Sequence, residues 1–187
     1  MKKGRLIILS GPSGVGKGTI REELFKNNEL NLTYSISMTT RKPRINEVNG
    51  IDYFFVSEKD FLSNIDDNQL IEWAEFVGNY YGTPKEYVDK LLAEGKNVVL
   101  EIEVQGATQV MNSCADVLSI FIVPPSLAEL EKRIKNRRTE TIEVVNARLE
   151  KATRELTLTG DYQFVVENNN LNDTVKEIEN IIKENTN

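Results

Sequence analysis

A glycine-rich stretch that directly follows a short apolar segment constrains the fold more than any other feature of this sequence. Residues 5–9 read RLIIL, which is typical of a buried strand, and residues 11–17 read GPSGVGK. Two glycines separated by four residues, with a lysine after the second, form the phosphate-binding loop pattern when a strand precedes and a helix follows. Glycines let successive backbone N–H groups converge on phosphate oxygens, and the helix start adds partial positive charge. The sequence therefore predicts a strand–loop–helix unit that binds a phosphate.

Many classes of nucleotide-binding protein share this loop, and its residues indicate how a nucleotide and its metal ion would be held. We expect Lys17 to reach the β- and γ-phosphates of ATP, and we expect Mg²⁺ to accompany the nucleotide. Gly18 stands where the pattern usually has serine or threonine, and Thr19 follows one position later. The ion is therefore expected to be held mainly by water and nucleotide oxygens, with Thr19 and Glu101 open as direct ligands. The residues expected to bind ATP in the loop are Gly11, Pro12, Ser13, Gly14, Val15, Gly16, Lys17, Gly18 and Thr19.

Apolar runs alternate with amphipathic segments along the rest of the chain. Further strands are predicted within residues 97–102, 117–123 and 162–166, and helices within 83–95, 126–137 and 174–185. Each predicted helix opens with a hydroxyl residue three positions before a glutamate, so Thr83, Ser126 and Thr174 are expected N-caps. Strands that alternate with helices predict an α/β fold, a mostly parallel sheet with helices on both faces.

Two regions interrupt this alternation. Residues 34–82 are rich in Tyr, Ser, Thr, Asn and Gly and contain short alternating strands, which predicts a small mixed or antiparallel insertion. Residues 136–148 are polar and arginine-bearing between two helices, which suits a lid. A chain of 187 residues is expected to form one domain. The core is then formed by residues 1–33, 83–135 and 149–187.

Composition excludes several functional classes. The chain has no histidine and one cysteine, which excludes histidine-based triads, an internal disulfide framework and a cysteine-built zinc site. Its net charge of −6 argues against a broad nucleic-acid surface. No segment has the apolar length of a signal peptide or of a membrane span, so no membrane partner and a cytoplasmic location are expected. Monomer and homodimer both stay open. Because a guanine-reading Asn-Lys-x-Asp motif is absent, a small kinase is favoured over a GTPase.

A second anion site is suggested by Arg41 and Arg44, which flank Pro43 in a segment that disfavours a helix. Two guanidinium groups on an extended loop could converge on the same phosphate, each in a bidentate manner, and Tyr53 and Tyr81 could add phenolic donors. On the arginines alone, a solvated surface patch is the simpler interpretation. The aromatic and acidic segments that follow shift the balance toward a binding site.

Taken together, five segments resemble the guanylate kinase family, which phosphorylates GMP with ATP: GPSGVGKGT, SISMTTRKPR, NGIDYFF, IEWAEFVGNYYGTP and LEIEVQGA. The resemblance covers nearly the whole chain and implies a core, a GMP-binding insertion and a lid. It implies a phosphate clamp for GMP made of Arg41, Arg44, Tyr53 and Tyr81. It also implies guanine readers at Ser37, Glu72 and Thr83, with Glu101 and Glu103 beside them in place of the aspartates of some relatives.

The same resemblance implies which residues act on the transferring group. Arg133, Arg137 and Arg148 match the arginines that close over ATP, so they are expected to be catalytic together with Lys17 and Arg41. Arg137 and Asn168 are expected to bind ATP, with the register of Asn168 among its neighbouring asparagines open by one. The acceptor is a phosphate oxygen that is already ionised at neutral pH, so the reaction needs charge neutralisation and alignment rather than a general base.

Base chemistry favours GMP, with dGMP also expected as an acceptor. Guanine presents N1–H and an amine on one edge, which a carboxylate such as Glu72 can accept together, whereas adenine presents a bare N1 acceptor there. Two alternatives are a kinase for another nucleoside monophosphate and a guanylate kinase-like scaffold module that binds peptides without catalysis. The presence of Lys17 argues against the scaffold, and Glu72 with the tyrosine-rich insertion argues against the other kinase.

Overall fold

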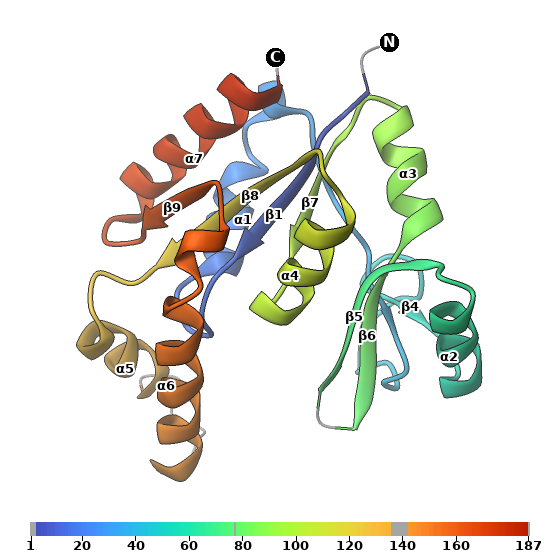
Figure 1. The fold of residues 1–187 in the computed structure, drawn as a ribbon, viewed down its shortest axis with the longest axis horizontal. Helices are drawn as coiled ribbons and strands as arrows, with labels where there is room; N and C mark the ends of the chain where they lie inside the picture. Colours follow the sequence, from blue (N-terminus) through green and yellow to red (C-terminus); the bar gives the residue numbers. More distant parts are fainter. Residues whose placement is uncertain (1–2, 77, 136–141, 187) are drawn as a thin grey trace.

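The computed structural model describes residues 3–76, 78–135 and 142–186. Within them, the larger sheet consists of five parallel strands. Their order in space is β2 (Leu32–Tyr34), β7 (Asn97–Glu101), β1 (Leu6–Ser10), β8 (Val117–Val123) and β9 (Phe164–Glu167). Figure 1 shows this sheet at the centre of the molecule with helices packed around it. The predicted parallel α/β core is therefore confirmed.

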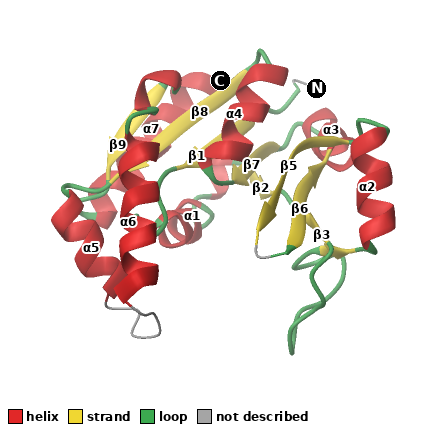
Figure 2. Cartoon of the chain, turned by 60° about the horizontal axis from the view of Figure 1, so that its bottom comes forward, coloured by secondary structure: helices red, strands yellow, loops and turns green. Residues whose placement is uncertain are grey.

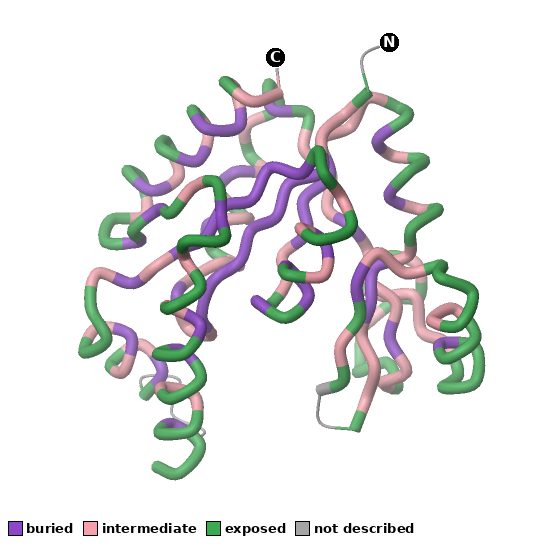
Figure 3. The backbone as a smooth tube through the Cα atoms, in the orientation of Figure 1, coloured by how far each residue is buried: buried purple, intermediate pink, exposed green. Residues whose placement is uncertain are grey.

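Both faces of the larger sheet are buried, which explains why its strands lack polar alternation. Ile7 and Leu9 of β1 pack with α1 (Lys17–Leu24) and α7 (Leu171–Thr186). Leu6 and Ile8 point to the other face, against α3 (Lys85–Ala93) and α4 (Val104–Ser113). Figure 3 shows the central strands as the most continuous buried part of the chain.

A second, smaller sheet is formed by β4 (Phe54–Phe55), β3 (Met38–Thr39), β6 (Asn79–Pro84) and β5 (Leu70–Phe76), in that order. It is mixed, because β3 pairs in parallel with β4 and antiparallel with β6. Helix α2 (Glu58–Asp66) follows β4 and packs against this sheet through Phe61, whose ring stacks on Tyr80 of β6 (Figure 2). The sequence analysis did not predict this helix, although Ser57 caps it by accepting the N–H of Asp60 at 3.1 Å.

Helices α5 (Leu127–Lys135) and α6 (Ile142–Leu156) pack on each other through Leu130, Ile134, Val145 and Ala152. Of the predicted lid, residues 136–141 lie outside the described residues, and residues 142–148 form the first turns of α6. The α5–α6 pair and the smaller sheet project from the same end of the larger sheet (Figure 1). None of the helices in the described ranges has the length and apolar character needed to cross a bilayer.

Of the three predicted N-caps, one is confirmed and two are wrong. Ser126 accepts the N–H of Glu129 at 3.1 Å, as expected. Thr83 instead belongs to β6 and its hydroxyl binds a carboxylate, so α3 begins at Lys85. The last helix begins three residues early, at Leu171, because the side chain of Asn170 accepts two N–H groups of its first turn and Thr174 is buried inside it. Short 3-10 helices span Asn28–Leu30 and Thr159–Asp161.

Candidate active site

The phosphate-binding loop links the end of β1 to α1, and steric contacts fix its shape. Gly11 has φ +146°, and a Cβ there would lie 2.3 Å from the carbonyl oxygen of Ile122. Gly16 has φ +103° at the N-cap of α1, and a Cβ there would lie 2.7 Å from Nδ2 of Asn168. Only glycine fits such positions without displacing a neighbour. The path of this loop is therefore determined by its own sequence and by the strand beside it.

Lys17 folds back over this loop. Its Nζ donates to the carbonyl oxygens of Gly11 at 2.6 Å and Pro12 at 3.1 Å. Burial lowers the pKa of Lys17, and the nearby carboxylates of Glu101 and Glu103 act in the opposite direction. The amine thus lies above the loop and donates to two uncharged carbonyl oxygens, which the negatively charged oxygens of a phosphate would replace as acceptors.

Two predicted site residues lie against the loop from other elements. Asn168 is buried and its Nδ2 donates to the carbonyl of Val15 at 2.8 Å. Arg133 of α5 donates to the Asn168 carbonyl at 3.1 Å, with the Val15 carbonyl 3.5 Å from its other nitrogen. The amide of Asn168 therefore holds the loop here, and adenine contact by Asn168 stays a prediction. Arg137 lies outside the described residues, and Arg148 lies half-buried on α6.

A cavity of about 340 Å³ lies between the smaller sheet and the end of β7. Six of the nine residues predicted to bind GMP line it: Ser37, Tyr53, Glu72, Tyr81, Glu101 and Glu103. These residues come from five different segments of the chain, so the fold assembles them from separate places. We refer to this space as the acceptor cavity.

Glu72 is the buried carboxylate of the acceptor cavity, with 6% of its surface exposed. The hydroxyl of Thr83 donates to its Oε1 at 2.5 Å. Its Oε2 fits against Gly106 of α4, where a Cβ would lie only 2.5 Å away. Burial raises the pKa of Glu72, and the hydrogen bond from Thr83 partly opposes that rise. Thr83 and Glu72, which were both predicted to read guanine, are therefore in direct contact, and their binding to guanine stays a prediction.

The predicted phosphate clamp is already paired with a carboxylate. The guanidinium of Arg41 donates to both oxygens of Glu47, at 2.9 and 3.0 Å, and lies over the ring of Tyr53 at 5.3 Å. The backbone N–H of Arg44 donates to the same Glu47 at 2.7 Å, while the Arg44 side chain is exposed. Arg41 lowers the pKa of Glu47. Sequence reasoning missed Glu47, although its place three residues after Arg44 on one loop was a usable signal.

A second cavity of about 440 Å³ lies at the phosphate-binding loop, and we call it the donor cavity. It shares three consecutive residues with the acceptor cavity: Glu101, Ile102 and Glu103, at the end of β7. Arg21 of α1 pairs with Glu101 at 3.2 Å. Two ligands, one in each cavity, would therefore meet at these residues.

The donor cavity also fits a magnesium ion. Thr19 and Glu101 both line it, and Oε1 of Glu101 lies 3.7 Å from where a Cβ of Gly18 would be. A hydroxyl and a carboxylate are oxygen ligands of the kind Mg²⁺ takes, with water and phosphate oxygens completing its shell. Within the described residues, no group of three or more His, Cys, Asp or Glu gathers to hold a metal. Thr19 and Glu101 thus form a partial set of oxygen ligands at this cavity.

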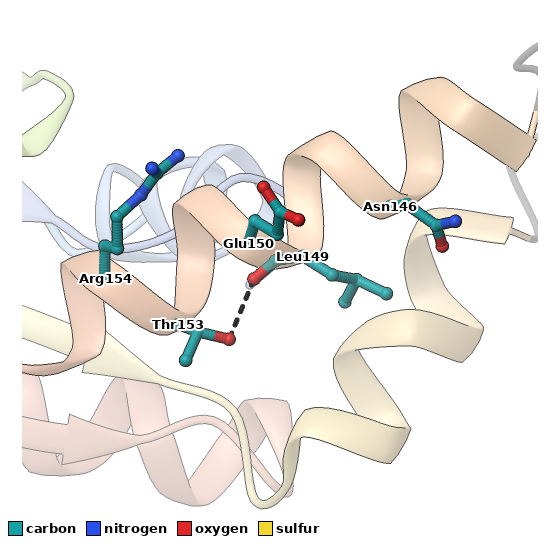
Figure 4. Close-up of a pocket in the computed structure, with 5 residues that line it drawn as sticks. All are labelled: Asn146, Leu149, Glu150, Thr153 and Arg154. Carbon is teal, nitrogen blue, oxygen red and sulfur yellow. Dashed lines mark hydrogen bonds between the residues drawn. The ribbon is translucent and has the colours of Figure 1, made fainter.

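A further groove of about 530 Å³ runs along α6 and contains none of the predicted site residues. Its lining residues are Asn146, Leu149, Glu150, Thr153 and Arg154, all on that one helix. Figure 4 shows them as sticks, with the hydroxyl of Thr153 donating to the carbonyl of Leu149. This surface is separate from the site described above.

A parallel sheet with a phosphate-binding loop after its first strand, joined to a second cavity, defines a P-loop nucleotide-binding protein. The guanylate kinase family model matches residues 3–185. The guanylate kinase of Bacillus subtilis is 51% identical over 181 residues, covering 97% of this chain and 89% of that protein. The chain therefore belongs to the guanylate kinase family.

Two further comparisons agree. The guanylate kinase of Mycoplasma capricolum is 56% identical over 182 residues, covering 97% of this chain. This chain spans only 61% of the length of that relative. The crystal structure of guanylate kinase from Anaplasma phagocytophilum superimposes with a TM-score of 0.76 at 33% identity, covering 99% of this chain and 87% of that one.

Proposed function

We propose that this protein transfers the γ-phosphoryl group of ATP to GMP, and also to dGMP, giving ADP and the nucleoside diphosphate. The observation that carries the proposal is the pair of cavities that share Glu101, Ile102 and Glu103, one at the phosphate-binding loop and the other around the buried Glu72. Membership of the guanylate kinase family supports the same activity.

Each half of the site has its own task in this reaction. Backbone N–H groups of the loop and Lys17 bind the ATP phosphates, and Arg133 approaches from α5 to neutralise charge. Glu72 accepts the two donors of guanine, oriented by the hydrogen bond from Thr83. Arg41 releases Glu47 and pairs with the GMP phosphate instead. It thereby orients one oxygen of that phosphate toward the γ-phosphorus of ATP. When bound, Mg²⁺ neutralises the β- and γ-phosphate oxygens, and Thr19 and Glu101 would hold it.

The proposal includes the division of the chain into a core, a GMP-binding insertion and a lid. Residues 34–82 carry the acceptor and residues 136–148, with Arg137 and Arg148, close over the donor, so that water is excluded when both nucleotides are bound. Distance measurements between the two segments, made by spectroscopy with and without both nucleotides, test this closure. Unchanged distances would contradict it. The cytoplasmic location and the choice between monomer and homodimer stay predictions.

The activity is tested by supplying ATP and Mg²⁺ with GMP, AMP, UMP or dTMP in turn and measuring ADP. We expect turnover with GMP and its loss in Lys17→Ala. Equal turnover of AMP would favour a kinase for another monophosphate. The absence of turnover with every acceptor would favour the non-catalytic module.

A further inference from the structure

The acceptor cavity is lined by a cation that the sequence analysis did not consider. Among the described residues that line this cavity, four are glutamates, Glu72, Glu75, Glu101 and Glu103, and one is a lysine, Lys151. A nucleoside monophosphate and a triphosphate that meet here add further negative charge. The repulsion between them must be offset close to the point of transfer.

Lys151 lies at the boundary between the two cavities. It is carried by α6, and its ammonium pairs with Oε2 of Glu103, a residue that lines both the acceptor and the donor cavity. It is also near the phosphate-binding loop, because its charge adds to the effect of burial in lowering the pKa of Lys17. Lys17 from α1 and Lys151 from α6 therefore lie close to the same part of the site.

The two carboxylates that hold Lys151 differ in burial and in position. Glu155 lies one helical turn further along α6, 8% exposed, with Oε1 at 3.7 Å from the ammonium. Glu103 lies at the start of α4, and its side chain is 56% exposed. Glu155 is therefore on the same helix as Lys151, whereas Glu103 reaches the ammonium from a different element. Burial opposes the charge of Lys151, but the two carboxylates together raise the pKa of Lys151, so the ammonium stays protonated at neutral pH.

We propose that Lys151 is an additional catalytic residue, whose ammonium exchanges Glu103 for an oxygen of the transferring phosphoryl group while Glu155 keeps it oriented. This inference rests on the proposed function. In the transfer, a GMP phosphate oxygen forms a bond to the γ-phosphorus. The bond from that phosphorus to the bridging oxygen breaks, and its electron pair leaves with ADP. Lys151 keeps its proton and offsets the charge on the moving group.

The test compares Lys151→Ala, Lys151→Arg and the matched control Lys183→Ala with the unaltered protein. Lys183 is also a helix lysine paired with a glutamate, Glu29, but it lies on α7 away from both cavities. At saturating ATP and GMP, we expect kcat of Lys151→Ala to fall by about 10²-fold, the size of effect seen when one preorganised charge-stabilising group is removed. Its KM values should change less than about threefold, because the interaction forms in the transition state. Lys151→Arg should stay within about tenfold, and Lys183→Ala should be unaffected.

Added ethylammonium separates a chemical role from a structural one. The small amine should restore part of the kcat of Lys151→Ala and leave the unaltered protein unchanged. An unchanged kcat in Lys151→Ala, a rise confined to KM for GMP, or a loss without amine rescue would each overturn the proposal. Should Lys151→Ala fail to fold, a loss beyond tenfold in folded Lys151→Arg would overturn it, and a smaller loss would support it. If the unaltered protein makes no GDP, the proposed function itself fails.

Discussion

The donor and acceptor cavities are built in opposite ways. The donor cavity is lined mostly by one continuous segment, the phosphate-binding loop and the start of α1, and Gly11 and Gly16 fix the backbone of that loop. The acceptor cavity is lined largely by side chains, such as those of Glu72 and Tyr81, that are carried on strands of the smaller sheet. A backbone cradle binds phosphate in any nucleotide, whereas a set of side chains distinguishes one base from another. Selectivity in this protein should therefore reside in the acceptor half.

The substitution with the largest expected effect tests the donor cavity, where the backbone of the phosphate-binding loop is expected to bind the nucleotide. Gly11→Ala places a Cβ against the carbonyl of Ile122 and strains a φ of +146°. We expect kcat/KM for ATP to fall by about 10²-fold or more, with a lower melting temperature. Gly160→Ala is the matched control, because a Cβ there meets nothing within 4 Å. Calorimetric titration should show GMP binding retained in the folded fraction of Gly11→Ala; loss of GMP binding there would break the separation of the two halves.

The substitution with the next largest expected effect tests the acceptor cavity, where side chains are expected to select the base. Glu72→Gln removes the charge that accepts both guanine donors, so kcat/KM for GMP should fall by at least about tenfold. The hydrogen bond from Thr83 and the fit against Gly106 survive, and a buried charge is lost. The melting temperature should therefore equal or exceed that of the unaltered protein. Unchanged kinetics would remove Glu72 from the site, and a large loss of stability would mean that its charge is structural.

The pH dependence of GMP binding sharpens the same contrast. Burial raises the pKa of Glu72 above the 4.5 of an ordinary glutamate, so protonation begins at a higher pH than at the surface. As pH falls through that pKa, the carboxylate loses its charge and KM for GMP rises toward the Glu72→Gln value. Glu72→Gln itself should lack this component, and comparing the two cancels titration of the GMP phosphate. Parallel profiles for the two proteins would contradict the assignment.

The smallest effect concerns the clamp. Glu47 occupies the guanidinium of Arg41, so it competes with the phosphate of an incoming nucleotide. Glu47→Gln weakens that competitor, and we expect KM for GMP to fall by about two- to fivefold with kcat unchanged, within the range of one weakened ion pair. Glu58→Gln on the exposed face of α2 is the control. A higher KM would mean that Glu47 holds the clamp in its working shape instead.

The two halves also differ in how well the sequence predicts them. Lys17 and its loop are contiguous, so a local pattern was sufficient. Thr83 was ambiguous because its hydroxyl fits a helix cap or a distant carboxylate equally well in sequence, and only the approach of Glu72 on the neighbouring strand decides. Lys151 gave no signal, since α6 must cross to the end of β7 before the lysine meets Glu103. Helix α2 was missed despite its Ser57 cap, because the surrounding strands dominated the pattern.

The three residues that both cavities share have a consequence for ligand design. Since the two cavities share Glu101, Ile102 and Glu103 as lining residues, one molecule with adenosine and guanosine joined by a phosphate chain is expected to reach into both. Its second purine would then bind at a high effective concentration rather than from dilute solution. Because the cavities share these residues, a single bisubstrate inhibitor is expected to occupy both and to bind more tightly than either nucleotide alone.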